Sequence, residues 1–177
     1  MRIGTRRSAL ALAQARLIAE LLGEGEIVPL ATRGDRGAGS EDKSRWVAEL
    51  EDALLEGRID LAVHSAKDVP GELAEGLALH GAPARAAAED VICGAQDLDA
   101  LDLGARVGTS SIRRVAQLRA VREDLDLVSI RGNVDTRLRK LSEGADNVDA
   151  IVLARAGLQR LGRESEIGGP LDGERFV

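Results

Sequence analysis

Aromatic residues are almost absent from this sequence, whose 177 residues include one Trp, one Phe and no Tyr. The core must therefore be aliphatic, and a surface that stacks single-stranded nucleic acid on aromatic rings is disfavoured. A single cysteine, Cys93, excludes an internal disulfide framework. Two histidines accompany it without the ligand spacing of a metal site, so no metal is expected.

Long hydrophobic runs are also missing. No apolar segment approaches the roughly 20 residues of a membrane-spanning helix. The first residues lead directly into a strand pattern, and not into the apolar stretch of a signal peptide. The sequence therefore predicts a cytoplasmic protein without a membrane partner.

Charge is unevenly distributed along the chain. The formal net charge is −6, yet residues 106–140 hold nine Arg or Lys against four Asp or Glu. A local basic segment on an acidic body argues against nucleic acid, whose phosphate backbone needs an extended basic surface. A small molecule with several carboxylates or phosphates fits this distribution better.

Two short motifs concentrate the positive charge, GTSSIRR at 108–114 and RGNVDTR at 131–137. Each places arginines beside hydroxyl or amide side chains at the predicted start of a helix. Positive charge at that end opposes the helix macrodipole, so stability alone would favour Asp or Glu there. Arg113 and Arg114 therefore predict an anion between themselves and the exposed helix amides.

Strand and helix patterns alternate through the chain. The predicted strands are 2–5, 26–31, 59–63, 77–81, 90–94, 106–108, 125–130 and 150–154. The predicted helices are 9–22, 46–55, 111–121, 134–143 and 157–161. A Gly-rich polar loop at 32–45 is expected to be mobile, the small residues at 82–89 predict a crossing between domains, and no pattern is assigned after Gly162.

This alternation predicts an α/β fold of two mostly parallel sheets with flanking helices. Ligands bind beyond the carboxyl ends of the strands in such sheets. Both arginine motifs directly follow predicted strands, as do Thr5–Arg6 and His64–Asp68. The sequence therefore predicts that four loops converge on one cleft.

Seven segments, in order, resemble the porphobilinogen deaminase (hydroxymethylbilane synthase) family. They are GTRRSALALAQA (4–15), TRGD (32–35), VAELEDALL (47–55), AVHSAKDVP (62–70), GTSSIRR (108–114), RGNVDTR (131–137) and AGLQRLG (156–162). The resemblance implies two lobes, 1–84 and 85–177, similar to type II periplasmic binding proteins. It also implies a transferase of tetrapyrrole (heme, porphyrin) biosynthesis that joins four porphobilinogen units head to tail and releases ammonia.

The resemblance also implies roles for individual residues. Asp68 matches the catalytic aspartate of the family. The substrate-binding positions are Arg6, Ser8, Trp46, Arg137 and Arg160. The positions that hold the family's dipyrromethane cofactor are Lys43, Lys67, Thr109, Ser110, Ser111, Arg113, Arg114 and Arg131.

Each of these roles has a structural alternative. Asp68 can pair with Lys67 or cap a turn before Pro70. Ser8 and the hydroxyls of 109–111 can cap helices, and Trp46 can pack in the core. Arg119, Arg122 and Arg139 are expected to be solvated surface residues. His64 is left out of catalysis, because a lone histidine is more often structural.

The sequence departs from the family pattern at its end. The resemblance implies a return strand for the first lobe and a third, cofactor-bearing domain, both expected to be missing after Val177. The cysteine that anchors the cofactor is then not in this chain, and Cys93 is expected to pack in its strand. This chain is predicted to be inactive by itself, and the full-length family form is predicted to be a monomer; the alternative function is a non-enzymatic two-lobe anion-binding module.

Overall fold

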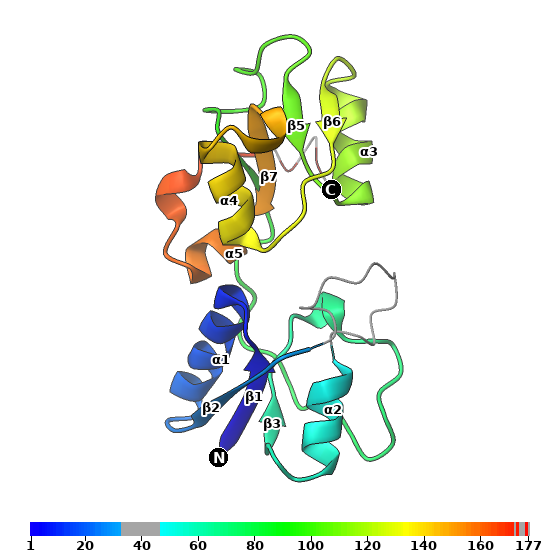
Figure 1. Ribbon diagram of the computed structural model, residues 1–177, viewed down its shortest axis with the longest axis vertical. Coiled ribbons are helices and arrows are strands. Elements are labelled where there is room, and N and C mark those ends of the chain that lie inside the picture. The colour runs from blue at the N-terminus through cyan, green and yellow to red at the C-terminus, as the bar shows by residue number, and fades with distance from the viewer. Residues whose placement is uncertain (33–46, 172, 174–175, 177) are drawn as a thin grey trace. The chain divides into compact units, whose positions relative to one another are not determined.

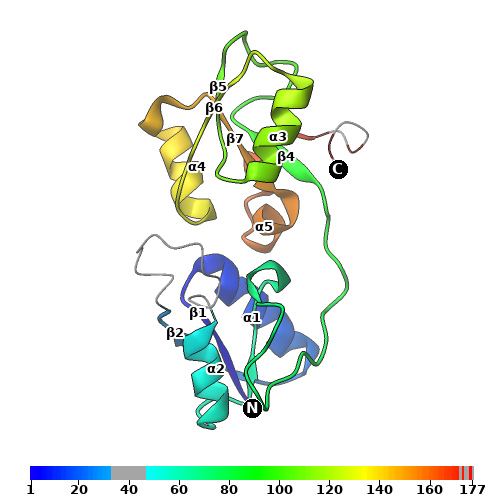
Figure 2. The same ribbon diagram turned by 90° about the vertical axis from the view of Figure 1, so that its right-hand side faces the viewer.

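The chain forms two compact units, Met1–Ala84 and Arg85–Val177. The computed structural model describes residues 1–32, 47–171, 173 and 176. Each unit has its own sheet, and the connection between them is extended around residue 84 (Figures 1 and 2). Each unit is therefore described by itself.

The first unit has a three-stranded parallel sheet in the order β2–β1–β3 (Figure 1). Its strands are β1 (Arg2–Arg6), β2 (Glu26–Leu30) and β3 (Leu61–Ala62). Helix α1 (Ala9–Leu21) connects the first two strands, α2 (Ala48–Leu55) precedes β3, and a 3₁₀ turn, η3 (Ala66–Asp68), follows it. The carboxyl ends of β1 and β3 therefore lie side by side.

Close packing fixes the centre of this sheet. Leu50 and Ala53 of α2 form a buried cluster with Ile59. Gly4 of β1 permits their approach, because a Cβ at this position would lie 2.2 Å from Ile59 Cδ1. At the other end of the unit, Gly23 follows α1 with a φ of +77°, a conformation that glycine adopts readily.

The second unit has a five-stranded sheet in the order β6–β5–β7–β4–β8. Its strands are β4 (Asp90–Cys93), β5 (Arg106–Gly108), β6 (Asp126–Val128), β7 (Ala150–Ala154) and β8 (Gly169–Pro170). Its helices are α3 (Ile112–Val121), α4 (Val134–Ser142) and α5 (Arg155–Arg160), with short 3₁₀ turns η4 (Ala145–Asn147) and η5 (Glu164–Glu166).

The α/β class is confirmed, but the second sheet is mixed. β5 pairs in parallel with β6 and β7, whereas β4 is antiparallel to both β7 and β8. Strand β8 lies in the region after Gly162 to which the sequence assigns no pattern. Its backbone groups are paired, since Gly168 N–H donates to Ile92 C=O at 2.9 Å and Leu171 N–H donates to Asp90 C=O at 2.8 Å.

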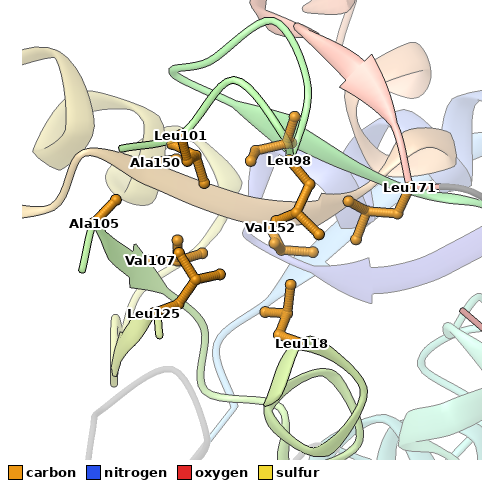
Figure 3. Close-up of a cluster of buried hydrophobic side chains, with 10 residues drawn as sticks. Leu98, Leu101, Ala105, Val107, Leu118, Leu125, Ala150, Val152 and Leu171 are labelled. Atoms are coloured by element: carbon orange, nitrogen blue, oxygen red, sulfur yellow. The ribbon is translucent and has the colours of Figure 1, made fainter. Parts of the chain in front are cut away.

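Both faces of the second sheet are covered by aliphatic clusters. One cluster joins Leu118 of α3 to Val107, Val152 and Leu171 (Figure 3). The other joins Leu138 of α4 and Leu158 of α5 to residues of β4 and β7. Burial of these side chains on two faces fixes where α3 and α4 begin relative to the strand ends.

The strand predicted at 77–81 is wrong. These residues have no strand assignment; they line the same pocket as Leu61 and Ala62 of β3, and Leu79 is 74% exposed. A strand needs a hydrogen-bonded partner, and the described part of the chain supplies none here. The helix predicted at 157–161 begins earlier, at Arg155.

Arg122 also differs from its expected surface role. Its guanidinium donates to the backbone carbonyls of Leu98 (2.9 Å) and Leu101 (3.2 Å) and pairs with Asp124 at 2.7 Å. Arg122 therefore connects the 98–102 loop to the end of α3.

No helix in the described part of the chain is both long enough and apolar enough to span a membrane.

Candidate functional site

In the first unit, Arg6 and Asp68 approach each other from two strand ends. Arg6 is the last residue of β1, and Asp68 lies in η3 after β3. Arg6 Nη1 lies 4.0 Å from Asp68 Oδ2, and the two side chains are 20% and 28% exposed. The topology of the sheet therefore brings together a cation and a carboxylate that are 62 positions apart in the sequence.

His64 belongs to the same group. Burial lowers the pKa of His64, the Asp68 charge opposes this shift, and the Arg6 charge adds to it. All three side chains therefore interact electrostatically. His64 was not among the residues predicted for the site. The feature of the sequence that could have identified it is its position four residues before Asp68, at the end of a predicted strand.

Hydrogen bonds fix the turn that carries Asp68. Asp68 N–H donates to Ser65 C=O at 2.9 Å. Ser65 Oγ donates to Gln14 Oε1 at 3.1 Å, which ties the turn to α1. Lys67 is exposed on the turn, and among the described residues the ion-pair partner of the Asp68 carboxylate is Arg6 and not Lys67.

Ser8 is the N-cap of α1. Its Oγ accepts a hydrogen bond from Ala11 N–H at 3.3 Å, so the capping interpretation is confirmed. A substrate-binding role for Ser8 stays a prediction.

In the second unit, local hydrogen bonds shape the GTSSIRR motif. Ser111 Oγ accepts from Arg114 N–H at 3.4 Å and is the N-cap of α3, as the structural alternative predicts. Thr109 is buried, and its Oγ1 accepts from Ser111 N–H at 3.3 Å. Ser110 Oγ lies 3.1 Å from Ser129 Oγ and donates to Ile130 C=O, which joins the motif to the segment after β6.

The anion next to Arg113 and Arg114 is a residue of the chain itself. Asp90 Oδ1 accepts from Arg114 Nη2 at 2.6 Å, and Asp90 Oδ2 accepts from Arg114 Nε at 2.8 Å and from Arg113 Nη2 at 3.1 Å. The prediction of an anion at this helix start thus finds an internal carboxylate, which the sequence analysis did not identify. Asp90 ends the extended crossing segment, 23 residues before Arg113, and no local spacing connects them.

The second arginine motif begins α4. Asn133 Oδ1 accepts from Thr136 N–H at 2.9 Å as the N-cap. Arg137 Nε donates to Gly132 C=O at 2.8 Å. Burial lowers the pKa of Arg137, and the charge on Arg114 lowers it further. The two motifs therefore place Arg114 and Arg137 near each other, while Arg131 is exposed beside them.

Positively charged side chains outnumber negatively charged ones in this arginine site. Two guanidinium groups, those of Arg113 and Arg114, pair with the carboxylate of Asp90, and a third, that of Arg137, is close enough to Arg114 to feel its charge. Arg137 has no carboxylate partner among the described residues, and its guanidinium donates there to a backbone carbonyl. Partly desolvated guanidinium groups with spare N–H donors are suited to binding carboxylates or phosphates.

The other residues predicted for the site are Lys43, Trp46 and Arg160. Lys43 and Trp46, together with residues 33–45 of the predicted mobile loop, lie outside the described residues. Arg160 is partly buried at the end of α5. In the described part of the chain, no group of three or more His, Cys, Asp or Glu side chains is placed to hold a metal ion.

Cys93 is buried in β4, as the sequence predicts. Burial raises the pKa of its thiol to about 11, and the charge of Glu166 adds to the shift. The thiolate is the reactive form of cysteine, so this side chain is a poor nucleophile at neutral pH.

Together, the two groups define an α/β protein with a carboxylate beside a cation in one unit and a cluster of arginines around helix starts in the other. The profile of the family described as "Porphobilinogen deaminase, dipyromethane cofactor binding domain" matches residues 1–177. The chain belongs to the porphobilinogen deaminase family.

Curated relatives agree with this assignment. Porphobilinogen deaminase of Xanthomonas axonopodis pv. citri is 48% identical over all of this chain and 62% of its own length. The Roseiflexus and Deinococcus deserti proteins of the same name are both 49% identical, over 93% and 89% of this chain and 58% and 55% of their own. The chain thus spans little more than half the length of these relatives.

Solved structures give a weaker similarity. The periplasmic VFT2 domain of Bordetella pertussis BvgS is 17% identical with a TM-score of 0.49, covering 97% of this chain and 75% of that domain. The fold described above rests on the strand pairing of this chain alone.

Proposed function

We propose that this chain supplies the cofactor-binding, substrate-binding and catalytic residues of a porphobilinogen deaminase, a cytoplasmic, monomeric transferase. The observation that carries the proposal is the arginine site. Arg137 is partly desolvated near Arg114, and its guanidinium donates a hydrogen bond to the backbone carbonyl of Gly132. Its charge is a cost to the isolated chain and becomes favourable when a carboxylate binds.

The expected ligands provide those carboxylates. Each porphobilinogen unit carries an acetate and a propionate on its pyrrole ring. Guanidinium forks bind such groups with two parallel hydrogen bonds, so several arginines can hold several units by their side chains. We assign Arg113, Arg114 and Arg131 to the cofactor and Arg6, Arg137 and Arg160 to the substrate.

Asp68 is assigned the catalytic role. When porphobilinogen loses ammonia, it becomes an electron-poor azafulvene cation, and the new bond forms when the pyrrole at the end of the growing chain attacks it. A fixed carboxylate stabilises that cation and accepts or returns a proton at the pyrrole nitrogen. The bond between Asp68 N–H and Ser65 C=O and the nearby Arg6 guanidinium hold the carboxylate in one place.

The residues present fit a dipyrromethane cofactor, because the half-buried Arg137 and the neighbouring Arg114 have N–H donors left for a polycarboxylate. When bound, dipyrromethane supplies the pyrrole on which the chain grows. Thr109, Ser110 and Ser111 shape the arginine site, Lys67 lies on the Asp68 turn, and Lys43 is assigned by resemblance alone. Cys93 is not assigned as the anchor.

Calorimetric titration of the purified chain with porphobilinogen tests the binding part of the proposal. Arg131→Ala should weaken binding about tenfold, because one charge-assisted hydrogen bond contributes ~1.5 kcal/mol or more. Arg119→Ala is the matched control, since Arg119 is an exposed arginine in the C-terminal half of α3. Equal affinities for the two variants would contradict the assignment of Arg131.

Ammonia release measures the chemistry separately. Any turnover by the parent protein should be lost in Asp68→Ala, with porphobilinogen affinity changed less than threefold. Full turnover by Asp68→Ala would refute its catalytic role. Binding of porphobilinogen and of inorganic phosphate with equal affinity would favour the non-enzymatic anion-binding module.

A further inference from the structure

Asp90 has an unusual position for an exposed crossing segment, because its carboxylate is nearly enclosed. Its side chain is 9% exposed, and that of Arg114 is 13% exposed. The pair joins the first residue of β4 to the first turn of α3. Arg114 Nη1 also donates to Val152 C=O of β7 at 3.1 Å. One guanidinium thus connects two strands and a helix.

The geometry of this pair fixes the plane of the Arg114 guanidinium. Nε and Nη2 donate to the two oxygens of Asp90, and Nη1 donates to a backbone carbonyl. Three donors on three nitrogens leave the planar group no rotation without breaking a bond. Asp90 Oδ2 is shared with Arg113, whose side chain is 57% exposed.

We propose that Asp90 is a positioning residue for the arginine site: it orients Arg114 so that the remaining N–H groups of this guanidinium bind the carboxylates of the ligand. The proposal rests on the proposed function, because it takes the polycarboxylate-binding role of these arginines as given. Asp90 itself does not contact the ligand.

Positioning and simple charge balance make opposite predictions. If Asp90 only neutralised the arginines, its removal would leave a more positive site and tighter anion binding. If Asp90 orients them, its removal frees the guanidinium groups to rotate, and binding weakens although the site gains positive charge. Part of the binding free energy is then lost to ordering side chains that are already ordered in the parent protein.

Asp90→Asn tests this difference, with Glu89→Gln as the matched control. Both substitutions remove one negative charge from adjacent residues. Glu89 pairs on the surface with Arg155, at 3.0 Å, whereas Arg113 and Arg114 pair with Asp90. Affinities are measured by calorimetry with two probes, porphobilinogen and citrate, the second being a tricarboxylate without a pyrrole ring.

Asp90→Asn is expected to weaken binding of both probes about tenfold, whereas Glu89→Gln should leave each affinity within twofold or raise it. Tighter binding by Asp90→Asn would overturn the proposal. If citrate follows this pattern and porphobilinogen does not bind the parent protein, positioning holds and the proposed function fails. If neither probe binds the parent protein, both are overturned.

A double variant separates positioning from general destabilisation. Arg114→Gln alone should weaken binding about tenfold, and adding Asp90→Asn to it should cost less than a further twofold, because Asp90 acts through Arg114. The double variant also removes both charges of the buried pair, so it avoids an unpaired buried group. Additive losses in the two backgrounds would refute the proposal.

Discussion

Arg114 lies close enough to Arg137 for its charge to lower the pKa of Arg137, in addition to the larger effect of burial. The two residues begin different helices, and each is held by backbone or internal groups: Arg114 by Asp90 and Val152, and Arg137 by the carbonyl of Gly132. Two like charges kept together in a partly buried place are unfavourable for stability and are typical of a binding site.

Replacement of Arg137 tests whether this residue lowers the stability of the protein and strengthens ligand binding. Arg137→Gln should weaken polycarboxylate binding about tenfold and leave the thermal midpoint of the ligand-free protein unchanged or higher, because one of two repelling charges is gone. Calorimetry and thermal unfolding followed by circular dichroism give the two quantities. A lower midpoint with unaltered affinity would show that Arg137 is structural.

The pH dependence of stability should reveal His64. Burial lowers its folded-state pKa from the ordinary value of 6.5, with Asp68 opposing and Arg6 assisting the shift. Above pH 6.5 the imidazole is neutral in both states, and its stabilising contribution is complete. As the pH falls below 6.5, the unfolded state takes up the proton first, so the folded state loses stability.

His64→Asn should therefore reduce the loss of stability between about pH 6.5 and 5, measured by urea unfolding at closely spaced pH values. His80→Asn is the control, because His80 is exposed. The lowered pKa of Asp60, about 2 beside Arg2, acts in a different window: its contribution is lost only as the pH falls below 3.8. An identical acid slope for parent and His64→Asn would contradict the burial effect.

Cys93 should be chemically silent in the folded protein. Its thiol is buried and has a pKa near 11, so iodoacetamide at pH 8 should modify the protein in urea and not under native conditions. Mass spectrometry of the denatured protein should show the unmodified chain mass. A covalent dipyrromethane on this residue would mean that Cys93 is the anchor after all.

Gly132 should be required for the second arginine motif. Its φ is +120°, and a Cβ there would lie 2.6 Å from Thr136 Cγ2. Gly132→Ala should lower the free energy of unfolding by about 1–3 kcal/mol and weaken polycarboxylate binding, because the Gly132 carbonyl orients Arg137. The measurements are urea unfolding and calorimetry.

Gly71→Ala provides the comparison for Gly132. No heavy atom lies within 4 Å of a Cβ at Gly71, and its φ is not in the left-handed region. This variant should change neither stability nor binding measurably. A Gly132→Ala protein as stable as Gly71→Ala would show that the loop relaxes without cost.

Local patterns predicted the elements that they specify locally. Ser8 and Ser111 cap the helices that follow them, and Cys93 is buried in its strand. The alternation of elements gave the α/β class. The errors occur where a partner is distant in sequence: 77–81 has strand composition and no strand partner, whereas Gly169–Pro170 lacks strand composition and pairs with β4.

In the candidate site, too, local features could be predicted and contacts between residues distant in sequence could not. Residue type and position were enough to mark the two arginine motifs, since clustered arginines at helix starts conflict with the macrodipole, whereas Asp68 was selected by its match to the catalytic aspartate of the family. They did not show that Asp90 is the internal partner of Arg114 or that His64 lies near Arg6 and Asp68. Those relationships depend on strand order, which a local pattern does not encode.

The sequence by itself therefore determined the family, the α/β class and the two arginine motifs that we propose to bind anions. Tertiary structure decided which charge faces which: parallel pairing of β1 and β3 places Arg6 beside Asp68, and packing of α3 against the sheet places Arg114 on Asp90. The physical reason is that charges interact through space over a few ångströms. Only the folded chain sets those distances between residues far apart in sequence.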